Sequence, residues 1–180
     1  SSPMTLSLRD PHSLDELLNY RLLRLYAAST APVTRLMEGR WGITRREWRF
    51  IALLASQGEM SPSALAERAD LDRARTSKAI TSLVDKQLVQ RSLQPGNARR
   101  ALVVLSPAGL RLYAEVFPQV AAINARVLDV LDDTTVQALD RALSALTAHA
   151  VQLNGEVARD VLADRRAGGS RRLRAVEPPG

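Results

Sequence analysis

Cysteine is absent from this chain of 180 residues, and histidine occurs only as His12 and His149. The absence of cysteine excludes disulfides, thiol redox sensing and cysteine-based metal sites. Carboxylates are scattered over helix starts and exposed faces, and the sequence contains no Ser-His-Asp arrangement, glycine-rich phosphate loop or HExxH motif. We therefore expect no catalytic residue, no metal and no cofactor, and we interpret the histidines as structural, although His12 lies near enough to a helix start to approach a ligand.

Long uncharged apolar runs are missing as well, so the sequence predicts neither a membrane-spanning segment nor a secretory leader. The chain does contain 46% hydrophobic residues, enough for a core, in a length typical of one domain. Its net charge of +6 favours a polyanionic partner. A basic surface would also suit an anionic membrane, so charge alone does not identify the partner.

The most informative stretch of the chain begins with two short helices. Ser61 followed by Pro62 is typical of a helix start, because the hydroxyl can accept from a free amide and proline loses no hydrogen bond there. Asp72 is placed to cap a second helix, which should run over residues 73–86. The joint between the two helices, Asp-Leu-Asp at 70–72, is tight.

A hairpin should follow these helices. Residues 88–93 and 100–106 are short strand candidates, and Gln-Pro-Gly-Asn at 94–97 carries strong turn signals. Arg99 and Arg100 come directly after the turn, and a hairpin tip that carries arginine can enter the minor groove of DNA, where the negative potential attracts it. Two helices and a basic hairpin predict a winged helix-turn-helix.

The second of these helices has two different faces when its residues are placed about 100° apart. Thr76, Ala79, Ile80 and Leu83 share the face expected to meet the core. Small, hydroxyl and basic side chains on the other side suit a major groove, because they allow close approach and can bind phosphates or base edges. We predict DNA contacts from Arg73, Ala74, Arg75, Ser77, Lys78, Thr81 and Ser82, with Arg73 nearer the core edge and on a phosphate or an acidic neighbour. A charge run is more often a solvated face, but the neighbouring helix and hairpin favour DNA.

Several of these segments resemble the MarR-type bacterial transcriptional regulators. The motifs are Leu-Ala-Glu-Arg at 65–68, Asp72 followed by Thr-Ser-Lys at 76–78, the turn and arginines at 95–100, and Leu-Ser-Pro-Ala-Gly at 105–109. The wing of that family usually shows Asp-x-Arg, whereas this chain has Asn-Ala-Arg at 97–99, so the acid that would brace the arginine is missing. The resemblance covers about residues 12–155.

The resemblance implies a fold that is mainly α with a small β-hairpin wing, in which a winged helix-turn-helix domain is joined to a helical dimerisation layer. It also implies a cytoplasmic, nucleoid-associated homodimer that represses transcription and releases double-stranded operator DNA when a small aromatic compound binds. Within the family, the chain looks most like regulators of aromatic-acid catabolism, of the hydroxycinnamate or hydroxynicotinate kind.

We divide the chain into a flexible arm (1–11), an N-terminal dimerisation segment (12–43), the winged domain (44–106), C-terminal dimerisation helices (107–163) and a disordered basic tail (164–180). Capping boxes are expected at Ser13 with Glu16, Thr44 with Glu47, and Thr134 with Gln137. The first helix should break before Pro32, and Pro118 should kink a later helix or remove one of its hydrogen bonds. Leucine stripes on the outer helices exceed what a small winged core needs, and therefore predict a dimer interface.

Aromatic and arginine residues cluster near the first two helices and predict an effector site. Arg21 lies in the middle of a leucine stripe, and a buried arginine needs an anion, either an acidic residue of a partner subunit or a ligand carboxylate. Tyr20, Trp48 and Trp41 could cover an aromatic ring, although both tryptophans are more often core residues. The second-rank candidates for the polar end of the ligand are Arg24, Arg49 and His12.

A second hypothesis is an effector-independent winged-helix module that binds DNA or a protein as an architectural or interaction protein. Binding of aromatic acids would separate it from the first. An enzyme is a distant third, because the sequence offers no catalytic constellation.

Overall fold

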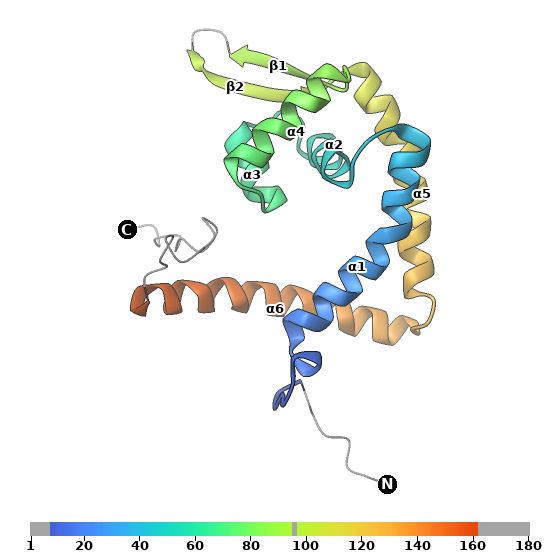
Figure 1. The fold of residues 1–180 in the computed structure, drawn as a ribbon, viewed down its shortest axis with the longest axis vertical. Helices are drawn as coiled ribbons and strands as arrows, with labels where there is room; N and C mark the ends of the chain where they lie inside the picture. Colours follow the sequence, from blue (N-terminus) through green and yellow to red (C-terminus); the bar gives the residue numbers. More distant parts are fainter. Residues whose placement is uncertain (1–7, 95–96, 162–180) are drawn as a thin grey trace.

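The computed structural model describes residues 8–94 and 97–161 (Figure 1). It is mostly helical with one two-stranded antiparallel sheet, which confirms the predicted fold class. Among the described residues, no helix combines the length and apolar character needed to cross a lipid bilayer. In chain order, the elements are a 3-10 turn (Leu14–Glu16), α1 (Leu18–Leu36), a π-helical turn (Met37–Trp41), α2 (Arg45–Gln57), α3 (Pro62–Ala69), α4 (Arg73–Asp85), β1 (Val89–Gln94), β2 (Asn97–Leu105), α5 (Pro107–Leu128) and α6 (Asp133–Asp160).

The hydrophobic core lies where α2, α3, α4 and the hairpin meet. Phe50 and Ile51 of α2 and Leu65 of α3 are fully buried there, and Leu83 of α4 is 1% exposed. Burial of apolar surface is the main favourable term in folding, so this cluster holds the winged domain together. Val116 of α5 completes the cluster from outside the winged segment.

The helical layer outside this core has a different character. α1 and α5 run side by side away from the winged domain, and α6 crosses their far end, opposite the hairpin (Figure 1). Every residue of α1 and of α6 is exposed or half-buried, although both helices carry many leucines. A single chain therefore leaves the apolar faces of this layer uncovered.

Most of the predicted helix starts are confirmed. Thr44 and Glu47 form the expected capping box, and the side chains of Ser61 and Asp72 accept hydrogen bonds from the backbone N–H groups of Ala64 and Arg75. The hairpin is also confirmed, with Val89 opposite Leu105 and a register irregularity beside the turn, between Leu93 and Gln94.

Two predicted capping boxes are wrong. The backbone of Ser13 is extended and precedes only a 3-10 turn, and α1 begins after Leu17. The carboxylate of Glu16 accepts instead from the backbone N–H of His12, at 2.8 Å. The last helix is capped two residues before the expected position, because Asp132 accepts from the N–H of Thr135 at 2.8 Å.

The predicted break before Pro32 is also wrong. α1 runs without interruption through Pro32 and ends in the π-helical turn of Met37–Trp41. Proline removes one backbone hydrogen bond from a helix, but packing of the same helix against α5 and the π-helical turn keeps it continuous. α5 likewise continues through Pro118.

Candidate nucleic-acid interface and effector site

The polar face of α4 is presented to solvent as its sequence predicts. Thr76, Ala79, Ile80 and Leu83 are buried. Arg73, Ala74, Arg75, Ser77, Lys78 and Thr81 are all exposed. At the start of the helix, the backbone N–H of Arg75 donates to Asp72 at 2.8 Å, and its guanidinium lies 3.6 Å from the same carboxylate. The capped helix thus holds an exposed row of small and cationic side chains beside the hairpin.

Ser82 differs from the other predicted DNA contacts. It is half-buried, and its hydroxyl donates to the carboxylate of Glu47 at 2.9 Å. That bond turns Ser82 toward α2 rather than outward along α4.

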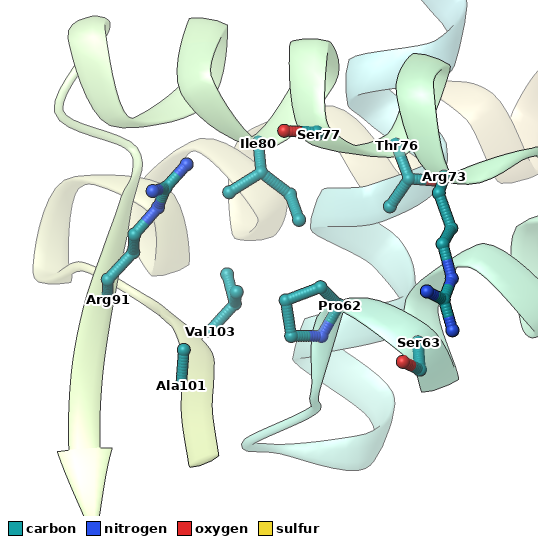
Figure 2. A pocket seen from close by; sticks show the side chains of 9 residues that line it. All are labelled: Pro62, Ser63, Arg73, Thr76, Ser77, Ile80, Arg91, Ala101 and Val103. Atoms are coloured by element: carbon teal, nitrogen blue, oxygen red, sulfur yellow. The ribbon is translucent and has the colours of Figure 1, made fainter. Parts of the chain in front are cut away.

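A hollow of about 350 Å³ separates α4 from the hairpin (Figure 2). Arg73 and Arg91 lie at its two ends, with Ile80, Pro62 and Val103 between them. The guanidinium of Arg91 donates to the hydroxyl of Thr81 at 3.2 Å, which ties β1 to α4. Sequence reasoning missed Arg91, although its place on a strand next to a helix that carries cations could have suggested a role.

The wing arginines were predicted to contact DNA. The backbone of residues 97–100 belongs to β2. The side chains of Arg99 and Arg100 lie outside the part of the chain that the structure describes, so their contacts stay a prediction.

The predicted ligand residues do not form one cluster. Arg21 and Arg24 are exposed on α1, and neither side chain makes a hydrogen bond or ion pair within residues 8–94 and 97–161. In the single chain its neighbours Leu18 and Leu25 are themselves 37% and 55% exposed, so burial of Arg21 stays a prediction for a dimer. A helical stripe buries a residue only if something covers it.

The remaining candidates have partners of their own. Trp48 is 9% exposed and stacks on Tyr113, with ring centroids 5.7 Å apart and planes 15° from parallel. Trp41 is half-buried against the core, and Tyr20 is half-buried on α1. His12 is exposed, with its ring nitrogen 3.4 Å from the carboxylate of Asp10. Trp48 is thus a core residue, in line with the more common role of large aromatics.

Arg49 lines a basic crevice between α1, α2 and α4. The crevice has a volume of about 640 Å³, and the other cations on its wall are Arg45, Arg46, Arg75, Lys78 and Lys86. Arg49 donates to the hydroxyl of Tyr26 at 2.5 Å and to the carbonyl of Ala69 at 3.2 Å, while the guanidinium of Arg45 lies 5.5 Å from the centre of the Tyr26 ring. The crevice therefore combines positive charge with an aromatic face, where α1 meets the winged domain.

A polar junction formed by Gly42, Glu47, Ser82 and Lys86 closes one side of this crevice. Glu47 is 2% exposed. Burial by itself would raise the pKa of Glu47, but hydrogen bonds from Lys86, the Thr44 N–H and Ser82, together with the charge of Lys86, hold that pKa below its ordinary value. The Glu47 carboxylate is therefore ionised near neutral pH.

A third cavity, of about 440 Å³, lies between α1, α5 and α6. Its lining is mostly aliphatic and includes Leu25, Val33, Ile123, Val136 and Leu143. None of the predicted ligand residues lines it.

The exposed recognition helix, the capped helix before it and the hairpin after it define a winged helix-turn-helix protein. Residues 41–100 match the model of the MarR family. A regulatory protein of Thauera aromatica, described as a candidate transcriptional regulator for the hcr operon, is 27% identical over 128 residues, which span 69% of this chain and 77% of that protein. The winged domain is therefore similar in sequence and fold to those of MarR-type transcriptional regulators.

Solved structures have the same fold. NadR in complex with 4-hydroxyphenylacetate has a TM-score of 0.63 and 26% identity, covering 76% of this chain and 94% of NadR. BpsR of Bordetella bronchiseptica, whose DNA binding is regulated by 6-hydroxynicotinic acid, has a TM-score of 0.67 and 23% identity, covering 76% of this chain and 97% of BpsR.

Proposed function

We propose that this protein is a homodimeric repressor that binds a two-fold operator and releases it when a small aromatic carboxylic acid binds. The observation that carries the DNA-binding part is α4, whose apolar side is buried while its basic side faces solvent next to the hairpin. Such a regulator acts in the cytoplasm, at the nucleoid. Residues 12–43 and 107–163 supply the dimerisation layer, and residues 44–106 bind DNA.

On the DNA, α4 enters the major groove. Arg75 and Lys78 are the base-reading candidates because their long cationic side chains can reach base edges, while Ala74, Ser77 and Thr81 allow close approach. Arg73 and Arg91, at the two ends of the hollow, bind phosphates. Arg99 and Arg100 bind in or beside the minor groove.

The test begins by selecting an operator from a random DNA library with the parent protein. We expect an inverted repeat with half-sites spaced by about one helical turn, near 10 base pairs. Arg75→Ala should weaken binding by about 1–3 kcal/mol and relax the preference at one base pair of each half-site. Lys78→Ala should also weaken operator binding. Quantitative binding assays on the selected operator and its single-base variants measure both effects.

Arg9→Ala is the matched control, since it removes an exposed arginine from the N-terminal arm, outside both the winged domain and the dimerisation layer. It should leave operator binding unchanged. If Arg75→Ala and Lys78→Ala bind operator and random DNA as the parent does, α4 is not the reading helix.

The effector part of the proposal rests on the basic crevice. Six cations and the Tyr26 ring suit the carboxylate and the ring of a flat acid, and NadR has been crystallised with an acid of this class. A ligand held between the dimerisation segment and the winged domain releases DNA only if it prefers a spacing of the recognition helices that misfits the operator. We place hydroxycinnamates and hydroxynicotinates first among the candidates. An effector-independent winged-helix module is the alternative, and it would bind none of these acids.

A further inference from the structure

We propose that Glu47 is the positioning residue that fixes the recognition helix against the entry of α2, so that it governs operator binding without touching DNA. Both oxygens of its buried carboxylate are engaged. One accepts from the Thr44 N–H and from the Lys86 ammonium, each at 2.8 Å, and the other accepts from the Ser82 hydroxyl at 2.9 Å. Glu47 thereby joins the start of α2 to Ser82 and Lys86, which lie 35 and 39 residues further along the chain.

The two donors on the recognition helix side belong to one face of α4. Ser82 and Lys86 are four residues apart, so they project from the same side of the helix, one turn after the other. Both therefore fix the C-terminal end of α4, while Asp72 caps its N-terminal end. Because these bonds run to α2, α4 cannot rotate about its axis or slide along α2 without losing the hydrogen bonds to Glu47.

Lys86 extends the junction toward the dimerisation segment. Its ammonium also donates to the carbonyl of Gly42 at 2.8 Å. Gly42 directly follows the π-helical turn at the end of α1 and has a φ of 61°, in the left-handed region that favours glycine. The end of α1, the start of α2 and the end of α4 thus meet at one ammonium–carboxylate pair.

Stability alone gives little reason to keep a carboxylate here. Burying a charge carries a desolvation cost that its partner often fails to exceed, and apolar replacements of such pairs are frequently neutral or stabilising. The pair instead fixes the position of α4 relative to α2, because each donor bonds to one particular oxygen of the Glu47 carboxylate. A dimer that must fit two half-sites with two recognition helices needs that geometry more than a monomer does.

This inference rests on the proposed reading of DNA by α4, so its test includes Arg75→Ala as a reference. Glu47→Gln keeps the size of the side chain but places an amide N–H₂ against donors. We expect its affinity for the selected operator to fall about tenfold. Its affinity for random DNA, and the salt dependence of that affinity, should stay as in the parent, because no phosphate contact is lost.

Lys86→Met and Ser82→Ala separate the two donors. Each should lower operator affinity, and each should lower it less in a Glu47→Gln background than in the parent, since paired groups are not additive. Glu67→Gln, an exposed glutamate on α3, is the matched control and should change nothing. Operator binding is measured well below the melting temperature of each variant. If Glu47→Gln does not fold, Ser82→Ala, which loses a single neutral donor, tests the junction in its place.

The outcomes are distinguishable. Loss of operator affinity at full random-DNA affinity, with coupling between Glu47 and the two donors, supports the proposal. Unchanged operator affinity in Glu47→Gln, or equal losses on operator and random DNA, overturns it. If Arg75→Ala has no effect, the reading of DNA by α4 fails instead.

Discussion

Arg21 and Arg49 are two possible anchors for an effector carboxylate, and their surroundings differ. Arg21 is exposed on α1 in the single chain. Arg49 is half-buried in the basic crevice, beside Tyr26 and Arg45. Because a partly buried guanidinium that is already oriented loses less freedom when it binds a carboxylate, the crevice favours Arg49. Arg21 becomes a comparable anchor for the carboxylate only if a second copy of the chain covers α1 and buries its side chain.

Calorimetry with 4-hydroxyphenylacetate, hydroxycinnamates and hydroxynicotinates decides between these two arginines. We expect Arg49→Ala to weaken binding of an acid by roughly tenfold or more, as expected for loss of a charge-assisted hydrogen bond, and Arg21→Ala to leave it unchanged. Operator DNA should weaken acid binding by the same factor by which the acid weakens DNA binding. If Arg21→Ala weakens acid binding and Arg49→Ala does not, the effector site lies on α1. If the parent protein binds none of the acids, the effector-independent module is favoured.

The same residues show what sequence can and cannot predict about a site. The capping box of Thr44 and Glu47 was predictable because its atoms lie three residues apart. The bonds from Ser82 and Lys86 to Glu47 were not, since they depend on how α4 packs on α2. Burial of Arg21 was predicted from a helical stripe, but a stripe reports which residues share a face and not what covers that face.

Among the elements, the start of α5 is fitted most tightly to its neighbours. A Cβ atom on Gly109 would lie 2.1 Å from the carbonyl oxygen of Leu88. Ser106 caps the helix through the Gly109 N–H at 3.0 Å, and its hydroxyl donates to the carbonyl of Gln87 at 2.7 Å. The first turn of α5 thus lies directly on the backbone that leads from α4 into β1.

Gly109→Ala should therefore destabilise the protein. The added methyl group meets backbone, which cannot rotate away, so the free energy of unfolding should fall by about 3 kcal/mol. Gly155→Ala is the matched control, because nothing lies within 4 Å of a Cβ on that glycine of α6, and alanine there should raise helix stability by up to about 1 kcal/mol. Chemical denaturation measures both changes. Equal stabilities for Gly109→Ala and the parent would show that α5 can shift away from Leu88.

Most helices and the hairpin were predictable from the sequence. Three helix starts with side-chain caps and the hairpin pairing are local signals, and all four are where the sequence placed them. Pro32 was mispredicted because packing of α1 on α5 is a tertiary contact that no local pattern reports. At Ser13 a second local bond competes, since the Glu16 carboxylate accepts from the His12 N–H instead. The fit of Gly109 was equally invisible, although its motif was part of the family resemblance.

The whole molecule leaves its outer helices uncovered in a single chain. Leu139, Leu143, Leu146 and Leu153 of α6 are 36–48% exposed, and they share one side of the helix at intervals of three, four and seven residues. The aliphatic cavity between α1, α5 and α6 adds to the same layer. An apolar surface of this extent is unusual on a monomer and typical of an interface, and a second copy is the partner we propose for it.

Leu146→Asp tests that interface at the scale of the assembly. In a dimer the substitution places an unpaired carboxylate among leucines, and the desolvation cost should dissociate or unfold the protein. Analytical ultracentrifugation should show the parent as a dimer and the variant at lower mass or unfolded. Leu8→Asp is the control, since Leu8 is 48% exposed in the N-terminal arm, outside the residues assigned to the dimerisation layer; this variant should stay dimeric. Because an operator with two half-sites is bound by two recognition helices, a folded Leu146→Asp monomer should also lose operator affinity steeply. A parent protein that is monomeric and binds the operator tightly at low concentration would contradict both expectations.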